Sequence, residues 1–319
     1  MTQITLTNTV PYEASGQRLD QAAAELFPQY SRARLQLWIK SGELTINGKP
    51  GKTNGKVVGG EVLDLQAELQ DQGDWQAEAI PLDIVYEDEH ILVVNKAAGM
   101  VVHPAAGNRE GTLLNALLYH CPSLSEVPRA GIVHRLDKDT TGLMVVAKTL
   151  EAQSNLVEQL QARTVSRQYQ AITLGRVISG GTVNLPIGRD SKHRQKMAVS
   201  KGADGKEAIT HYEVLERFGF FTHLRIKLET GRTHQIRVHM THQRFPLVGD
   251  PLYGTGKGLR TTQIHESVLA VAQQFPRQAL HAAQLGLAHP HTLEICQWQA
   301  PLPADMQQLL DVLREYDHT

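Results

Sequence analysis

The densest group of polar side chains in the sequence lies between two apolar runs, in the segment AGIVHRLDKDTTGL at residues 130–143. It contains two carboxylates, Asp137 and Asp139, close to Arg135. Polar residues placed in this way usually sit on a loop at the edge of a sheet, where catalytic groups are often found. A carboxylate there could act as a nucleophile or as a general base. The same pattern suits a structural turn in which an aspartate caps a helix or pairs with Arg135, so both interpretations stay open.

Three histidines within nine positions, His234, His239 and His242, raise the alternative of a metal-dependent hydrolase. Their spacing differs from the HExxH pattern, and no nearby glutamate stands where a general base would be needed. The sequence also lacks the GxGxxG and P-loop patterns of nucleotide-binding proteins. A glycosidase would need a pair of carboxylates, and only one strong candidate is evident. We therefore expect no metal and no small-molecule cofactor.

The composition is typical of a soluble globular protein, and the length of the chain suggests two domains. The chain has 319 residues, of which 41% are hydrophobic and 20% charged. No apolar run approaches the ~20 residues of a membrane helix, and the first fifteen residues lack the features of a signal peptide. The two distant cysteines, Cys121 and Cys296, fit a reducing compartment better than a disulfide scaffold. We expect a cytoplasmic protein without a membrane partner.

The net charge of −1 hides an uneven distribution of charged side chains. Residues 66–90 hold eight acidic and no basic side chains, whereas residues 188–206 hold six Lys or Arg against two Asp. Such segregation is expected where one face of a protein meets a polyanion. Scattered solvated charge is the alternative interpretation.

Two short helices and a hairpin are predicted near the N-terminus. Apolar residues at helical spacing predict helices over residues 16–27 and 31–41, and Asn47-Gly48 after a short apolar run predicts a tight hairpin. The exposed face of this unit would carry basic side chains able to contact phosphates, namely Arg32, Arg34, Lys40 and Lys49.

The stretch GQRLDQAAAELFPQYSRARLQLWIKSGELTINGK resembles the S4 RNA-binding domain, in which two helices precede a strand and an NGK turn. The resemblance implies an S4-like domain and linker over residues 16–76. An N-terminal extension, residues 1–15, would precede it, and a second domain, residues 77–319, would follow.

The second domain is predicted to be strand-rich and of the α+β class. Strands are predicted at residues 84–86, 91–94, 143–147, 168–174, 209–215 and 222–228, and helices at residues 112–120, 150–163 and 304–316.

Three separated segments of this domain resemble, in the same order, motifs of the RluA branch of the pseudouridine synthases. They are HRLDKDTTGLMVV at residues 134–146, RQYQA at 167–171 and TGRTHQIRVH at 230–239. The resemblance implies a catalytic domain built on a mainly antiparallel mixed sheet. It also implies isomerisation of uridines in large-subunit (23S) ribosomal RNA, within the helix 69 stem-loop, without a cofactor. One departure is Asn95-Lys96-Ala97, where the family usually has Asn-Lys-Pro, and the missing proline should loosen that turn slightly.

The same resemblance implies roles for individual residues. Asp137 would be the catalytic carboxylate that breaks and remakes the glycosidic bond, as nucleophile or as base, and Arg237 would stabilise its charged form. Tyr169 would stack on the flipped uracil and help to move a proton, although a core tyrosine is the simpler interpretation of its position. Arg135 would enter the space left by the flipped nucleotide. Further RNA contacts are expected from His134, Leu136, Arg232 and His234.

The expected partner is large-subunit ribosomal RNA, free or in an assembling subunit, bound by a monomer. The alternative from another class is a noncatalytic S4-type RNA-binding or ribosome-assembly factor with a decayed enzyme domain. The presence of Asp137, Tyr169 and Arg237 together favours the enzyme.

Overall fold

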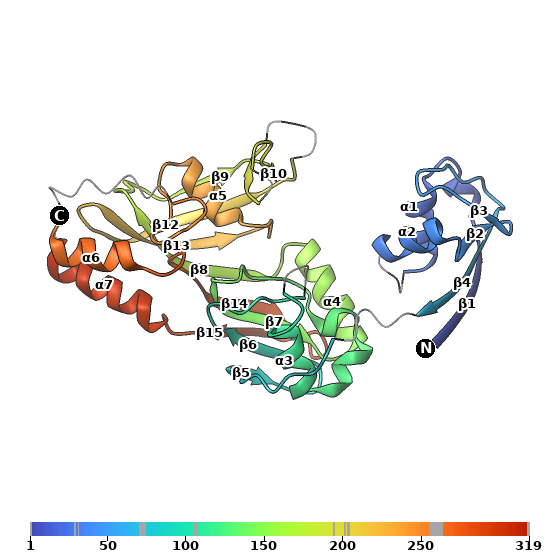
Figure 1. Cartoon of the computed structure of the whole chain (residues 1–319), viewed down its shortest axis with the longest axis horizontal. Coiled ribbons are helices and arrows are strands. Elements are labelled where there is room, and N and C mark those ends of the chain that lie inside the picture. The colour runs from blue at the N-terminus through green and yellow to red at the C-terminus, as the bar shows by residue number, and fades with distance from the viewer. Residues whose placement is uncertain are drawn as a thin grey trace. The chain divides into compact units, whose positions relative to one another are not determined.

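A computed structural model describes residues 2–28, 30, 32–69, 75–104, 108–193, 195–200, 202, 205–254 and 264–317. The chain forms two compact units, one up to residue 74 and one from Trp75 onward (Figure 1). The division falls near the end of residues 16–76, where the linker between the two domains was expected, and residues 70–74 lie outside the described part. Within the described residues, no helix combines the length and the apolar character needed to cross a bilayer.

The first unit packs two helices against a four-stranded antiparallel sheet of order β1-β4-β2-β3. Its elements in chain order are β1 (Thr2–Thr9), the 3-10 helix η1 (Tyr12–Ala14), α1 (Leu19–Leu26), α2 (Arg32–Ser41), β2 (Leu44–Ile46), β3 (Lys49–Pro50) and β4 (Val62–Leu69). Residues 1–15 were expected to form an extension, whereas β1 pairs with β4 from end to end. Ile4 and Leu6 alternate with polar residues and pack on the core of this unit, so β1 belongs to its sheet.

A buried carboxylate joins the two helices of this unit. The Asp20 side chain on α1 accepts hydrogen bonds from Arg18 at 3.0 Å, Arg32 at 2.9 Å and Gln36 at 2.5 Å. Burial alone would raise the pKa of Asp20, but these donors outweigh it and lower the pKa below its usual range. Arg32 is therefore engaged within the unit, although its side chain remains half exposed.

The second unit is built on a nine-stranded mixed sheet, in agreement with the prediction of a domain that mixes strands and helices. The spatial order is β5 (Ile84–Glu87), β6 (Ile91–Lys96), β7 (Thr141–Ala147), β14 (Leu280–Ala288), β8 (Ser166–Leu174), β13 (Phe221–Leu228), β12 (Ile209–Arg217) and β9 (Gly181–Asn184), with β15 (Ile295–Gln299) beside β14. Neighbouring strands in this sheet are antiparallel, except that β7 and β14 run parallel.

Helices cover this sheet and complete its cores (Figure 1). They are α3 (Leu113–His120), the 3-10 helices η2 (Pro122–Glu126) and η3 (Pro128–Gly131), α4 (Leu150–Gln161), α5 (Gln235–His242), α6 (Glu266–Gln274) and α7 (Ala304–Tyr316), together with the small hairpin β10 (Ile187–Arg189) and β11 (Met197–Val199). In α7, Met306, Leu309 and Leu313 recur at helical spacing and are fully buried. The predicted bounds of this helix match the structure, because its apolar periodicity is unbroken.

The loop of residues 132–140, here called the signature loop, enters β7 through a glycine that the fold requires. Gly142 has a φ of +115°, and a Cβ added there would lie 2.3 Å from the carbonyl oxygen of Ala282 on β14. The backbones of β7 and β14 thus approach closely just after the signature loop. This close approach fixes the position at which the loop joins the sheet.

Substitution of Gly142 with alanine should therefore destabilise the protein strongly. We expect Gly142→Ala to lower the free energy of unfolding by about 3 kcal/mol or more, because backbone overlap adds to conformational strain. Gly99→Ala is the matched control, since Gly99 has a φ of +78° with open space around its Cβ position, and strain alone should cost about 1 kcal/mol. Urea denaturation measures both. Equal losses for the two variants would show that the close approach carries no cost.

Candidate active site

A cavity of about 900 Å³ opens on the second unit where the three sequence motifs meet. Its lining includes the signature loop, Arg167 and Tyr169 on β8, and the segment from Leu228 to Arg237 that leads from β13 into α5. Segments far apart in the sequence thus share one cavity, because β7, β14, β8 and β13 are successive neighbours in the sheet.

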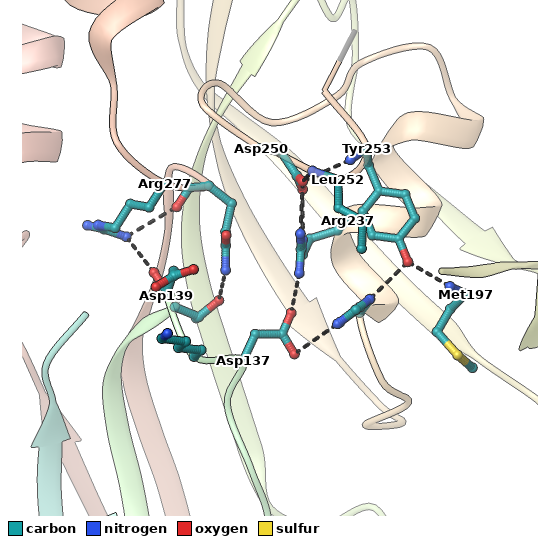
Figure 2. Close-up of polar contacts among 12 residues, drawn as sticks. Asp137, Asp139, Met197, Arg237, Asp250, Leu252, Tyr253 and Arg277 are labelled. Carbon is teal, nitrogen blue, oxygen red and sulfur yellow. Dashed lines mark hydrogen bonds and ion pairs between the residues drawn. The ribbon is translucent and has the colours of Figure 1, made fainter. Parts of the chain in front are cut away.

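The carboxylate of Asp137 lies against the guanidinium of Arg237 in this cavity (Figure 2). Nη1 of Arg237 donates a hydrogen bond to Oδ2 of Asp137 at 3.0 Å. The Asp137 side chain is 16% exposed and that of Arg237 is 7% exposed, so the pair is largely withdrawn from bulk water. Attraction between opposite charges is stronger in such a site than at the surface.

A second carboxylate, Asp250, fixes the opposite edge of the same guanidinium (Figure 2). Arg237 donates to it from Nε at 2.7 Å and from Nη2 at 2.8 Å, and the N–H groups of Leu252 and Tyr253 donate to its Oδ1 at 2.9 Å. Burial alone would lower the pKa of Arg237, but the hydrogen bonds and charges of Asp250 and Asp137 raise it above its usual value. The guanidinium is therefore charged and held in one orientation, with an N–H left to face Asp137.

His234 borders the carboxylate on another side. Its Nε2 lies 3.9 Å from Oδ1 of Asp137, and its Nδ1 lies 2.9 Å from the hydroxyl of Tyr253, which accepts a hydrogen bond from the N–H of Met197 at 2.7 Å. The negative charge of Asp137 raises the pKa of His234, but burial lowers it by more. The lowered pKa favours a neutral ring. His234 has a φ of +56°, a left-handed conformation that non-glycine residues adopt at a cost, so the fold around it must hold it there.

Tyr169 lies both in the core and in the wall of the cavity. It is 6% exposed and packs within the apolar core that also contains Leu136. Burial raises the pKa of its hydroxyl, with Arg167 partly opposing, so the phenol stays protonated near neutral pH. The catalytic and the core interpretations of Tyr169 are therefore compatible with one another.

The other residues expected from the sequence of this domain differ in their surroundings. Arg135 is exposed and lines the cavity, whereas His134 is turned inward and its Nε2 accepts the N–H of Val145 at 3.1 Å. Burial lowers the pKa of His134 to about 3, so the ring is neutral. Arg232 is exposed, lines the cavity and donates from Nε to the carbonyl of Glu207 at 2.9 Å.

The sequence placed His239 close to Arg237 and His234, and we expected it, like His234, to position backbone or phosphate there, but the structure places its side chain elsewhere. It is fully buried and bonds to the hydroxyl of Thr210 at 2.8 Å and to the carbonyl of Leu185 at 3.0 Å. Residues two apart on a helix point to different sides, so His239 faces the sheet while Arg237 faces Asp137.

In the first unit, the expected phosphate contacts have varied environments. Lys40 and Lys49 are exposed, and Arg32 pairs with Asp20 as described above. The guanidinium of Arg34 lies 5.6 Å from the ring centroid of Trp38.

Four residues of the site were not assigned roles from the sequence, namely Lys96, Arg167, Asp250 and Tyr253. Nζ of Lys96 is buried and donates to the carbonyls of Ala97, Met100 and Lys138, the last at 2.9 Å, which holds the signature loop beside Asp137. Burial lowers the pKa of Lys96 to about 8, while Asp139 and Asp137 oppose this effect. Lys96 could have been identified from the sequence, because a lysine at the end of the apolar strand ILVVNK is unusual. No pattern in the sequence around Asp250 indicates its role.

Comparisons with known proteins agree with this geometry. A family model described as RNA pseudouridylate synthase matches residues 90–242. Ribosomal large subunit pseudouridine synthase D of Pseudomonas aeruginosa is 59% identical over 306 residues, 96% of this chain and 95% of the relative. The protein of the same name from Escherichia coli K12 is 51% identical over 313 residues, 98% of this chain and 95% of the relative.

Among solved structures, human RNA pseudouridylate synthase domain containing 4 is similar, with a TM-score of 0.58 and 27% identity over 73% of this chain and 93% of that one. The chain therefore belongs to the family of RNA pseudouridine synthases. Within that family, its full-length similarity is to ribosomal large subunit pseudouridine synthase D, which confirms the family prediction made from the three motifs.

Removal of the Arg237 guanidinium should lower both the stability and the activity of the protein, and a second substitution should restore part of the stability alone. We expect Arg237→Ala to lower the free energy of unfolding by about 3 kcal/mol or more, because it leaves buried carboxylates without a partner. The double variant Arg237→Ala/Asp250→Ala removes the more buried of these carboxylates and should recover part of that loss, while activity stays low. Denaturation curves and single-turnover pseudouridine formation measure the two effects. A folded Arg237→Ala variant with full activity would refute the pairing.

Proposed function

We propose that this RNA pseudouridine synthase acts on large-subunit (23S) ribosomal RNA and isomerises uridines of the helix 69 stem-loop. The observation that carries the proposal is the Asp137–Arg237–Asp250 arrangement at the wall of a cavity of about 900 Å³. A cavity of this size can accept a whole nucleotide. The full-length similarity to synthases named for the large ribosomal subunit supports ribosomal RNA as the substrate.

In the proposed reaction the target uridine leaves the RNA stack and enters the cavity, because its glycosidic bond cannot be reached within a helix. Asp137 then acts at the ribose, either by attack on C1′ or by removal of the proton at C2′. Arg237 keeps the carboxylate charged and fixed in orientation, so little reorganisation is needed when the reaction begins. The enclosed cavity retains the detached uracil until it rejoins the ribose through carbon.

The surrounding side chains have proposed roles in holding the nucleotide. Tyr169 stacks on the uracil ring, Leu136 supplies an apolar wall, and Arg135 occupies the space that the base leaves in the RNA. His234 contributes a hydrogen bond near Asp137, and Arg232 contacts a phosphate. His134 acts indirectly, since its ring supports the start of the signature loop.

The first unit is proposed to act as an S4-like RNA-binding domain, with this domain and its linker over residues 16–76 and the catalytic domain over residues 77–319. Its exposed Lys40 and Lys49, with Arg34 and the exposed part of Arg32, would contact phosphates of the ribosomal RNA. We further propose that the protein works in the cytoplasm as a monomer, without metal or cofactor, during ribosome assembly.

Loss of the Asp137 charge should abolish catalysis without preventing RNA binding. We expect Asp137→Asn to reduce single-turnover pseudouridine formation by about 10⁴-fold or more, as is typical when the essential group of a covalent or proton-transfer step is removed. RNA affinity should change little, since the amide has the same size. Pseudouridine mapping and filter binding on a helix 69 stem-loop measure both. A normal rate in this variant would disprove the role of Asp137, and an inactive wild-type protein that binds RNA tightly would favour the noncatalytic alternative.

The proposed S4-like surface makes a separate prediction about salt. We expect Lys40→Gln/Lys49→Gln in the full chain to weaken RNA binding and to reduce the slope of log K against log salt by about 1 to 2. Binding releases counterions from each phosphate that a lysine contacts, and the double variant makes fewer such contacts. Lys227→Gln, at an exposed position of β13 in the second unit, is the control. An unchanged slope in the double variant would exclude these lysines from the interface.

A further inference from the structure

Arg167 is a buried cation that faces the cavity without a counter-charge among the described residues. It lies on β8, is 8% exposed and lines the cavity together with Tyr169 and Asp137. Of its five N–H donors, one at Nη2 reaches the carbonyl oxygen of Glu229 at 3.0 Å. Its Nε is buried and has no hydrogen-bond partner in the described part of the chain.

A purely structural role would leave this arrangement unexplained. A buried guanidinium is normally paired with a carboxylate, as Arg237 is with Asp137 and Asp250, because an uncompensated charge is costly to remove from water. The carboxylate of Glu229, the residue whose carbonyl Arg167 contacts, pairs instead with Arg163 and His211. Burial lowers the pKa of Arg167, which reflects the same unmet demand for a negative partner.

The glycine of the segment TGRTHQIRVH, Gly231, leaves room for the guanidinium of Arg167. A Cβ added to Gly231 would lie 2.8 Å from Nη1 of Arg167, so a larger residue would push the guanidinium aside. Gly231 and the carbonyl of Glu229 together hold Arg167 at the cavity wall, with Nε buried and unpaired and with the donors of Nη1 left for a ligand. The pocket thus contains a net negative group, formed by Arg237 with its two carboxylates, and a separate net positive group at Arg167.

We propose that Arg167 is a catalytic residue that stabilises the negative charge of the detached uracil. This inference rests on the proposed function. When the C1′–N1 bond breaks, its electron pair stays on uracil as an anion delocalised over N1, O2 and O4. The ribose carbon C1′, which loses this electron pair, either forms an ester bond to Asp137 or forms a double bond to C2′ as the C2′ proton passes to Asp137. Uracil leaves as an anion in either case.

The remaining steps restore the balance of atoms and charge. After the ring turns, C5 bonds to C1′, and the bond to Asp137 breaks or C2′ regains its proton. C5 then loses its proton and N1 takes one up, so the product is an isomer of the substrate. The cavity therefore needs a fixed positive charge only while uracil is detached, and Arg167 offers one with a single donor already used.

The test compares Arg167→Gln with wild type in single-turnover experiments on a helix 69 stem-loop, with Arg225→Gln, an exposed arginine of β13, as the control. We expect Arg167→Gln to slow pseudouridine formation by about 100-fold, as for removal of one donor to a developing oxyanion. RNA affinity and its salt dependence should stay unchanged, and the free energy of unfolding should stay equal or rise, since an unpaired buried charge is removed. Arg225→Gln should match wild type.

A second substrate gives a readout that a structural role would not move. The 5-fluorouracil anion is more stable than the uracil anion, so cleavage of 5-fluorouridine RNA should depend less on Arg167. We expect a smaller rate defect for Arg167→Gln on that RNA, and Gly231→Ala, which displaces the guanidinium, should give the same pattern.

Three results would overturn the inference. Weaker binding with a lower salt slope and a normal rate would assign Arg167 to a backbone phosphate. Loss of stability in Arg167→Gln would make it structural. Equal rate defects of Arg167→Gln on both RNAs would show that Arg167 does not stabilise the uracil anion. Failure of the proposed function itself is distinguishable, because wild type would then form no pseudouridine.

Discussion

The guanidinium of Arg237 is shared between two carboxylates, and the geometry of the cavity depends on this sharing. Asp250 accepts two hydrogen bonds from this guanidinium and two more from backbone N–H groups, and this fixes an N–H of Nη1 toward Asp137. Asp137 and Arg237 are 100 residues apart in sequence. Their contact requires the order β7-β14-β8-β13 in the sheet, the glycine at position 142 and the start of α5 just after His234.

Charge is distributed unevenly around the cavity, and this distribution links structure to reaction. The group formed by Arg237 and its two carboxylates carries a net negative charge, with a neutral His234 beside it. Arg167 supplies positive charge on β8, where no described carboxylate neutralises it. A reaction that separates a ribose electrophile from a uracil anion needs opposite charges at two positions, and fixed groups stabilise both without reorganisation.

Much of this could be predicted from the sequence where the signal is local. Apolar spacing predicted α7 with its observed bounds and α4 with its start, although α4 ends at Gln161 and not at residue 163. The motifs containing Asp137 and Arg237 identified the members of the ion pair. β14 was not predicted, because HAAQLGLA is rich in alanine and glycine and lacks the alternation that marks a strand, although it lies at the centre of the sheet. Asp250 and Tyr253 were missed because their partners are set by tertiary structure alone.

The role of Asp137 is tested most directly by a crystal structure of the protein bound to a stem-loop RNA whose target uridine is replaced by 5-fluorouridine, in which fluorine blocks the loss of a proton from C5. We expect this base to lie unstacked in the cavity against Tyr169, with its ribose C1′ beside the Asp137 carboxylate and Arg237 still bonded to Asp250. A base that stays stacked in the RNA, or that binds away from Asp137, would contradict that role.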